Sequence, residues 1–281
     1  MELGLVDNLL MALGSRSLTE DRFMAPDIAR GYVVGTGWWC DETSDHAGTQ
    51  FNESTDYIRT RDFFRLWYAC VDRYTDPEKI LVVDSNSPVR PKLPDDDRLE
   101  FLSLAENFGH YVDCDPARMC GVERVHLMCA LYAYLNDCDL IYIEQDCLVL
   151  GEGWVDRCYE NWSEGKIMYG DGEGTPQPQQ QSLVLVARPY IPIFIQRLLV
   201  YFFAAREELT QGAPIGPRSP EKRWHQAFKK DVDYLPFGYG RARPLDFDAR
   251  DLYAQHWEQD ELNEALVREG LEVFFEVDAD K

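Results

Sequence analysis

The chain has 281 residues, 45% of them hydrophobic, which is enough to bury one sizeable core and excludes disorder as the default state. Its 28 Lys and Arg residues are outnumbered by 50 Asp and Glu residues, and the resulting formal charge of −22 repels nucleic-acid backbones and anionic lipid surfaces. We therefore expect no nucleic-acid partner, although an anionic small molecule can still bind where a metal ion or local cations reverse the field.

Membrane insertion and secretion are both disfavoured by the sequence. No run of eighteen apolar residues occurs, and the amino terminus has no basic segment before an apolar stretch, so we expect a cytoplasmic protein without a transmembrane segment. Eight cysteines occur without a CxxC pair or zinc-site spacing, which favours reduced, buried thiols over a disulfide framework.

The first part of the chain is predicted to be a helical extension followed by a parallel βαβ unit. Residues 1–30 are expected to form an amphipathic helix and a connector, which serve packing or a homodimer contact. A strand over residues 31–35 is predicted to end in Gly-Thr-Gly, followed by an aromatic helix over 60–74 and a buried strand over 79–83. A right-handed crossover places these two strands side by side and parallel.

The rest of the chain continues the alternation of strands and helices. After a Pro- and Asp-rich loop, a helix is predicted over residues 116–136, and a third buried strand over 140–143 leads directly into Glu144-Gln145-Asp146. The remaining predicted elements are strands over 166–169 and 182–187, helices over 191–208 and 221–230, and a loop-rich tail. Because no repeat or linker is found, we predict one α/β domain over 31–281, with a mostly parallel sheet flanked by helices.

The acidic triplet at the end of the third strand is the strongest candidate for chemistry. Open α/β sheets bind ligands beyond the carboxyl ends of their strands. Alternate residues of an extended segment point the same way, so Glu144 and Asp146 can converge on one hard cation, Mg²⁺ or Mn²⁺, while Gln145 points elsewhere. Other acid-x-acid triplets occur at 113–115, 137–139 and 246–248, but this one alone directly follows an apolar strand that comes after a βα unit.

The stretch DLIYIEQDCLVLGEGW, with its upstream helix, resembles the metal-binding DxD region of glycosyltransferases with the Rossmann-like glycosyltransferase-A fold. The resemblance covers residues 31–256 in the order of elements, with Glu144 where the first Asp is usual. It implies a nucleotide-sugar donor, a saccharide or glycan acceptor and a divalent metal. By the same resemblance His256 completes the metal site, and Glu221 is the general base of an inverting transfer. Retaining chemistry would need no such base, and the residues leave the stereochemistry open.

Donor contacts are expected from residues at the ends of several predicted strands and loops. The resemblance assigns the nucleotide to the Gly-Thr-Gly segment and to the end of the second strand. Two arginines in a Gly-flanked loop are expected to close over the diphosphate, because cations are scarce in this chain. The full expected set is Gly35, Thr36, Gly37, Asp84, Arg124, Gln145, Arg241 and Arg243.

Each of these residues also has an ordinary structural explanation. Asp84 lies in a turn-forming sequence, and the Gly-Thr-Gly segment suits a tight turn. Glu221 suits the first turn of a helix, His256 lies among aromatic residues, and the two arginines can pair with nearby acids. These explanations stay open at the level of sequence.

Two other functions are compatible with the same pattern. A sugar nucleotidyltransferase shares the sheet and the metal carboxylates, but it needs a basic, Gly-rich loop after the first strand, and no Lys or Arg follows that strand before Arg59. A non-catalytic nucleotide- or carbohydrate-binding module would keep the fold without turnover, and the altered triplet is compatible with it.

Overall fold

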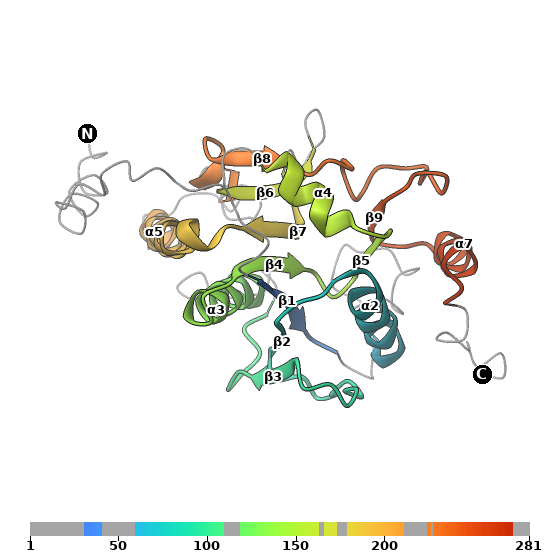
Figure 1. Cartoon of the computed structure of the whole chain (residues 1–281). Coiled ribbons are helices and arrows are strands. Elements are labelled where there is room, and N and C mark those ends of the chain that lie inside the picture. Colours follow the sequence, from blue (N-terminus) through green and yellow to red (C-terminus); the bar gives the residue numbers. More distant parts are fainter. Residues whose placement is uncertain are drawn as a thin grey trace.

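The computed structural model describes residues 31–40, 60–109, 119–162, 166–172, 179–210, 224–225 and 227–271. Within these residues a seven-stranded sheet runs in the order β3-β2-β1-β4-β7-β6-β8 (Figure 1). All neighbouring strands pair in parallel except β7, which is antiparallel to both β4 and β6. The predicted mostly parallel sheet is therefore confirmed. Its strands are β1 (Tyr32–Trp38), β2 (Lys79–Asp84), β3 (Leu99–Ser103), β4 (Asp139–Ile143), β6 (Ile167–Asp171), β7 (Gln179–Val186) and β8 (Val232–Tyr234).

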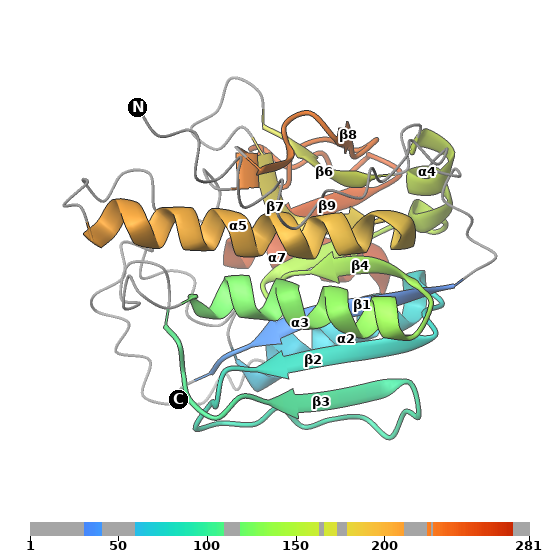
Figure 2. The ribbon, with the colours of Figure 1, turned by 90° about the vertical axis from the view of Figure 1, so that its left-hand side faces the viewer.

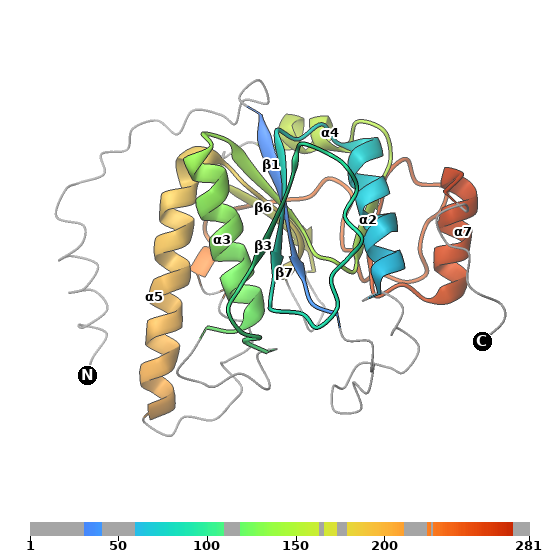
Figure 3. The ribbon, with the colours of Figure 1, turned by 90° about the horizontal axis from the view of Figure 1, so that it is seen from below.

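Helices cover both faces of this sheet, as expected. Helices α3 (Gly121–Leu135) and α5 (Ile191–Thr210) run side by side on one face (Figure 2). Helix α2 (Arg61–Tyr74) lies on the opposite side, as does α7 (Gln259–Glu269) (Figure 3). A second, two-stranded antiparallel sheet joins β5 (Cys147–Leu150) to β9 (Leu252–Gln255).

The predicted βαβ unit is present with the expected boundaries for its helix. The Thr60 side chain caps α2 by accepting a hydrogen bond from the Phe63 amide at 3.3 Å, and the helix ends just before the Asp76-Pro77 turn. Its aromatic residues are buried in the core, except for the partly buried Tyr68. Strand β1 pairs with β2 in parallel from Val33 through Trp38, so the crossover is the one predicted.

Strand β1 is longer than predicted, which corrects the interpretation of its glycines. The Gly-Thr-Gly segment does not end the strand but continues it, paired with β2. A Cβ on Gly35 would lie 2.7 Å from the Cys129 sulfur, and one on Gly37 would lie 3.2 Å from the Val125 side chain. The glycines therefore let α3 pack closely on the strand.

The tail is more regular than predicted. It was expected to be loop-rich, but it contains β9 and α7, and the edge strand β3 and helix α4 (Trp154–Asn161) were also not predicted. All four residues of strand β9 are buried, and the strand pairs with the distant β5. Its sequence therefore shows no polar alternation that would predict a strand. The predicted amino-terminal extension lies outside the described residues. Of the predicted helix over 221–230, the described residues 224–225 and 227–228 are helical, and 229–230 form a turn.

The chain order of the strands reverses across the sheet between β1 and β4. Strand β1 leads to β2 through α2 on one face, and β3 leads to β4 through α3 on the other. The strand order therefore has a switch point between β1 and β4, and open α/β sheets bind ligands beyond the carboxyl ends of their strands at such a point. The carboxyl end of β4 is the acidic triplet.

Two further expectations concern cysteines and membranes. All seven cysteines in the described part are free and buried, as predicted, and Cys114 lies outside it. None of the helices in the described ranges combines the length and the apolar character that a membrane crossing requires.

Acid sensitivity is expected at His126, which is buried in α3 against the rings of Tyr142 and Trp224. Its Nδ1–H donates to the Val122 carbonyl at 2.8 Å, and burial lowers the pKa of the imidazole to about 4. Between pH 6.5 and 4 the unfolded state therefore binds more protons than the folded state. His126 thus lowers the free energy of unfolding as the pH falls through that window, and it has no such effect above it.

We predict that His126→Phe, which keeps the ring packing, flattens the pH dependence of the free energy of unfolding by about 3 kcal/mol between pH 7 and 4. Urea unfolding at both pH values measures the difference between wild type and variant. Parallel pH profiles would contradict the assignment.

Candidate functional site

The acidic triplet forms the turn between β4 and β5. The Cys147 amide donates to the Glu144 carbonyl at 3.0 Å, which closes a β-turn, and the Glu144 amide donates to the Ser182 carbonyl on β7 at 2.8 Å. The Gln145 amide group binds the backbone at the end of β1: its oxygen accepts from the Trp39 N–H at 2.8 Å and its nitrogen donates to the Trp39 carbonyl at 3.2 Å. The turn is thereby bonded both to β7 and to the backbone that follows β1.

The two carboxylates of the triplet converge on one atom. The Gln255 side-chain nitrogen donates to a Glu144 oxygen at 2.6 Å and to an Asp146 oxygen at 3.0 Å. Asp146 and Gln255 are buried, with 4% and 3% exposure, whereas Glu144 is half-buried. The two side chains face the same way as expected, but a tight turn brings them together rather than an extended segment.

The other end of Gln255 belongs to a buried polar network. Its oxygen accepts from Arg241 Nε at 2.9 Å and from the Gln180 side-chain nitrogen at 3.0 Å. Because an arginine can only donate and an ionised carboxylate can only accept, these partners fix which end of the amide faces the acids. The site therefore draws on β4, β7 and β9 together.

Strand β9 and the loop before it complete this network. The Gln180 oxygen accepts from the Gly240 amide at 2.7 Å and from the Tyr253 hydroxyl at 3.0 Å, and that hydroxyl also bonds Ser182 at 2.7 Å. Burial raises the pKa of Tyr253 well above its usual value, so the phenol keeps the proton that it donates. A Cβ on Gly240 would lie 2.7 Å from the Tyr253 ring, so no side chain fits there.

His256, the third predicted metal ligand, follows directly after β9. Its Nε2 lies 3.8 Å from an Asp146 oxygen, and the residue adopts a left-handed φ of 59°. The three predicted ligands are therefore neighbours. Within the described ranges, however, no group of three or more His, Cys, Asp or Glu side chains is arranged to hold a metal ion. The donor types suit a divalent cation, but the Gln255 nitrogen lies between the two acids.

The two arginines predicted to bind the diphosphate have different surroundings. Arg241 reaches the acidic pair through Gln255. Arg243 donates to the carbonyls of Gln255 and His256 at 3.0 and 3.2 Å, and its Nε lies 2.5 Å from a Glu261 carboxylate. The salt bridge considered for Arg243 is thus present, and its contact with a nucleotide-sugar stays a prediction.

Asp84 lies at the carboxyl end of β2, beside Trp38 of β1. It is buried, and its carboxylate accepts from the Ser87 amide at 2.9 Å, while the Ser87 hydroxyl accepts from the Cys40 amide at 3.1 Å. The local turn bonding expected of this sequence is therefore present. Asp84 braces the end of β1, and its contact with a nucleotide stays a prediction.

The remaining predicted residues lie around the same edge or outside the described part. Thr36 is buried within β1. Arg124, in the first turn of α3, donates to the Met119 carbonyl at 2.9 Å, and its guanidinium carbon lies 3.5 Å from the centre of the Phe108 ring. Glu221, the predicted general base, lies outside the described residues.

Sequence reasoning missed the glutamines that organise the site. Gln180 belongs to a polar run that was included in a loop, and Gln255 lies in the tail predicted to be irregular. The available signal was the apolar Leu-Tyr-Ala run immediately before Gln255, which favours a short buried strand but does not indicate its partner.

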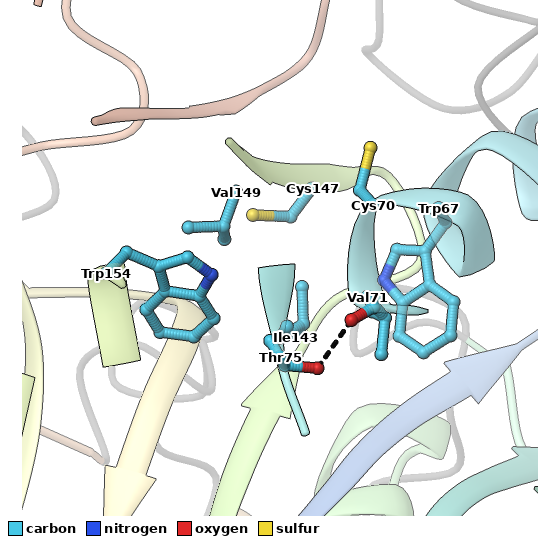
Figure 4. Close-up of a pocket in the computed structure, with 8 residues that line it drawn as sticks. All are labelled: Trp67, Cys70, Val71, Thr75, Ile143, Cys147, Val149 and Trp154. Carbon is cyan, nitrogen blue, oxygen red and sulfur yellow. Dashed lines mark hydrogen bonds between the residues drawn. The ribbon is translucent and has the colours of Figure 1, made fainter. Parts of the chain in front are cut away.

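A narrow cavity about the size of one water molecule lies between α2 and β5 (Figure 4). The Thr75 hydroxyl at its wall donates to the Val71 carbonyl at 2.6 Å, and the other side chains around it are mostly apolar. It is a packing gap rather than a ligand site. Its walls are Trp67, Cys70, Val71, Thr75, Ile143, Cys147, Val149 and Trp154.

Comparison with known proteins gives loose structural similarities. No protein-family model and no curated protein matches the chain. Among solved structures, it is similar to the galactosyltransferase LgtC in complex with donor and acceptor sugar analogs, with 10% identity over 72% of each chain and a TM-score of 0.44. An active-site mutant of LgtC gives 12% identity over 72% of each chain and a TM-score of 0.47.

A third similar structure is the glycosyltransferase GlyE of Streptococcus pneumoniae TIGR4. It shows 12% identity over 73% of this chain and 45% of that chain, with a TM-score of 0.41. Because likeness at this level is loose, the chemistry of the site is argued from its own residues.

The link from Gln145 to Trp39 makes a testable contribution to stability. We predict that Gln145→Ala lowers the free energy of unfolding by about 1–3 kcal/mol, because two partly buried backbone groups lose their amide partner. Gln259→Ala, which removes an exposed amide bonded only to Asn263, is the matched control and should change it by less than about 0.5 kcal/mol. Equal effects in urea unfolding would contradict a bracing role for the turn.

Proposed function

We propose that the chain is a glycosyltransferase that moves a sugar from a nucleotide-sugar donor to a saccharide or glycan acceptor. The observation that carries this proposal is the convergence of Glu144 and Asp146 on one nitrogen at the carboxyl edge of the sheet. This edge lies at the β1–β4 switch point, where α/β sheets bind nucleotides and other ligands.

A divalent cation, Mg²⁺ or Mn²⁺, is part of this proposal. Carboxylate oxygens from Glu144 and Asp146 and an imidazole nitrogen from His256 are donors that such ions accept. A bound cation would neutralise the charge that builds on the departing diphosphate. The burial of Asp146 supports this role, because a carboxylate removed from water interacts more strongly with charge.

The local cations support an anionic ligand in a chain that is strongly acidic overall. Arg241 is hydrogen-bonded to the same glutamine that contacts both acids, so a positive charge already lies next to the pair. We propose that Arg241 helps to bind the diphosphate of the donor. The nucleotidyltransferase alternative lacks comparable support, because the residues after β1 carry no cation before Arg59.

An inverting reaction with Glu221 as the general base completes the proposal. In such a reaction a carboxylate within hydrogen-bond reach of the acceptor hydroxyl takes its proton as the bond to the sugar forms. The acceptor would approach from the side of β7, whose Ser182 flanks the acidic turn.

The first test is a thermal-shift screen of nucleoside diphosphates with and without Mn²⁺. We predict that one nucleotide raises the melting temperature only when Mn²⁺ is present, since a ligand at about 100 times its dissociation constant adds about 2.7 kcal/mol of stability. Asp146→Asn should remove the shift, because it removes a charge from the convergent pair. Asp248→Asn, in the exposed acid-x-acid triplet of the tail, should leave it intact.

Two outcomes of this screen would count against the proposal. A shift that persists in Asp146→Asn would place the ligand away from the acidic turn. If none of the common nucleotides gives a metal-dependent shift in melting temperature, the proposed nucleotide-sugar donor is contradicted.

The second test asks whether bound donor turns over. We predict that the protein with Mn²⁺ slowly releases nucleoside diphosphate from one nucleotide-sugar, that Asp146→Asn abolishes the release, and that Glu221→Gln lowers it about 100-fold without changing nucleotide affinity. Metal-dependent nucleotide binding with no release from any donor would instead identify a non-catalytic binding module.

A further inference from the structure

We infer that Gln255 competes with the metal ion for Glu144 and Asp146, so that a cation binds only when the Gln255 side chain withdraws. The inference rests on the metal of the proposed function. The position of the Gln255 side chain would then control whether the acidic turn binds the metal ion.

The amide nitrogen of Gln255 lies between the two acids. It contacts Glu144 at 2.6 Å and Asp146 at 3.0 Å, and hydrogen bonds from an amide to ionised carboxylates are among the stronger ones. A cation bridging the same two acids binds their oxygens at roughly 2.0–2.2 Å. A cation bound to Glu144 Oε2 and Asp146 Oδ1 would lie where the amide nitrogen lies, so the two exclude each other at these oxygens.

The amide of Gln255 cannot simply turn over and offer its oxygen to the cation. Its oxygen already accepts from Arg241 Nε and from the Gln180 nitrogen, and turning would set the amide N–H groups against both donors. Gln180 is itself held, because the Gly240 amide and the Tyr253 hydroxyl both donate to its oxygen. The network thus keeps the nitrogen of Gln255 toward the acids.

Both glutamines of the network are buried. Gln255 and Gln180 are 3% and 2% exposed, so water does not readily replace any hydrogen bond that is lost. In the metal-free protein Gln255 separates two carboxylates that would otherwise lie close together without a shared donor. Removing it raises the free energy of the metal-free state, and metal binding becomes more favourable by the same amount.

The test is Mn²⁺ affinity in the absence of nucleotide, measured by the electron paramagnetic resonance signal of free Mn²⁺. We expect Gln255→Ala to bind Mn²⁺ at least tenfold more tightly than wild type, which is roughly the effect of losing one hydrogen bond to a charged group. Gln255→Asn, whose shorter side chain keeps the amide, should also bind more tightly and serves if the alanine variant does not fold. Gln259→Ala should match wild type.

The outcomes separate this inference from the function on which it rests. If wild type binds Mn²⁺ and both Gln255 variants bind it equally or more weakly, the competition is refuted while the metal site stands. If neither wild type nor the Gln255 variants bind Mn²⁺, both the competition and the metal are refuted. Tight binding that survives Asp146→Asn in the Gln255→Ala background would place the ion elsewhere and overturn the inference.

Discussion

Two carboxylates held around one amide nitrogen are the constraint on which the rest of the site depends. Placing the carboxylates of Glu144 and Asp146 close together, where little water reaches them, costs free energy unless hydrogen-bond donors or positive charge compensate for it. The surrounding structure supplies that compensation. The hydrogen bonds between Gln145 and Trp39 fix the turn. Strand β9 places Gln255 beside the acids, and Arg241 orients that glutamine by donating to its oxygen.

The fold makes this arrangement possible by bringing together segments that are distant in sequence. Parallel pairing of β1 with β2 and β4 sets their carboxyl ends along one edge of the sheet. The antiparallel strand β7 begins at that edge, which places Gln180 there, and β9 is brought to the same edge by its pairing with β5. A chain with a net charge of −22 thus assembles a site in which hydrogen bonds of one glutamine link two acids to an arginine.

Sequence predicted those parts whose signal is local. The aromatic periodicity predicted α2, and continuous apolar runs predicted β2 and β4, because burial on both faces leaves no polar alternation in a parallel strand. The acidic triplet was found for the same reason, since it directly follows such a run. The residues that come together through tertiary pairing were missed: Gln255 acquires its role only when β9 pairs with β5. Gly35 was interpreted as part of a turn because the close approach of Cys129 is not visible in the sequence.

The central claim is that a divalent cation binds between Glu144 and Asp146. The most direct measurement is a crystal structure of the protein soaked in Mn²⁺, with an anomalous difference map. The account predicts an anomalous peak at bonding distance from both carboxylates, with His256 nearby and the Gln255 side chain turned away from the acids. A map with Gln255 still bridging the two carboxylates and no peak beside them, at saturating Mn²⁺, would contradict it.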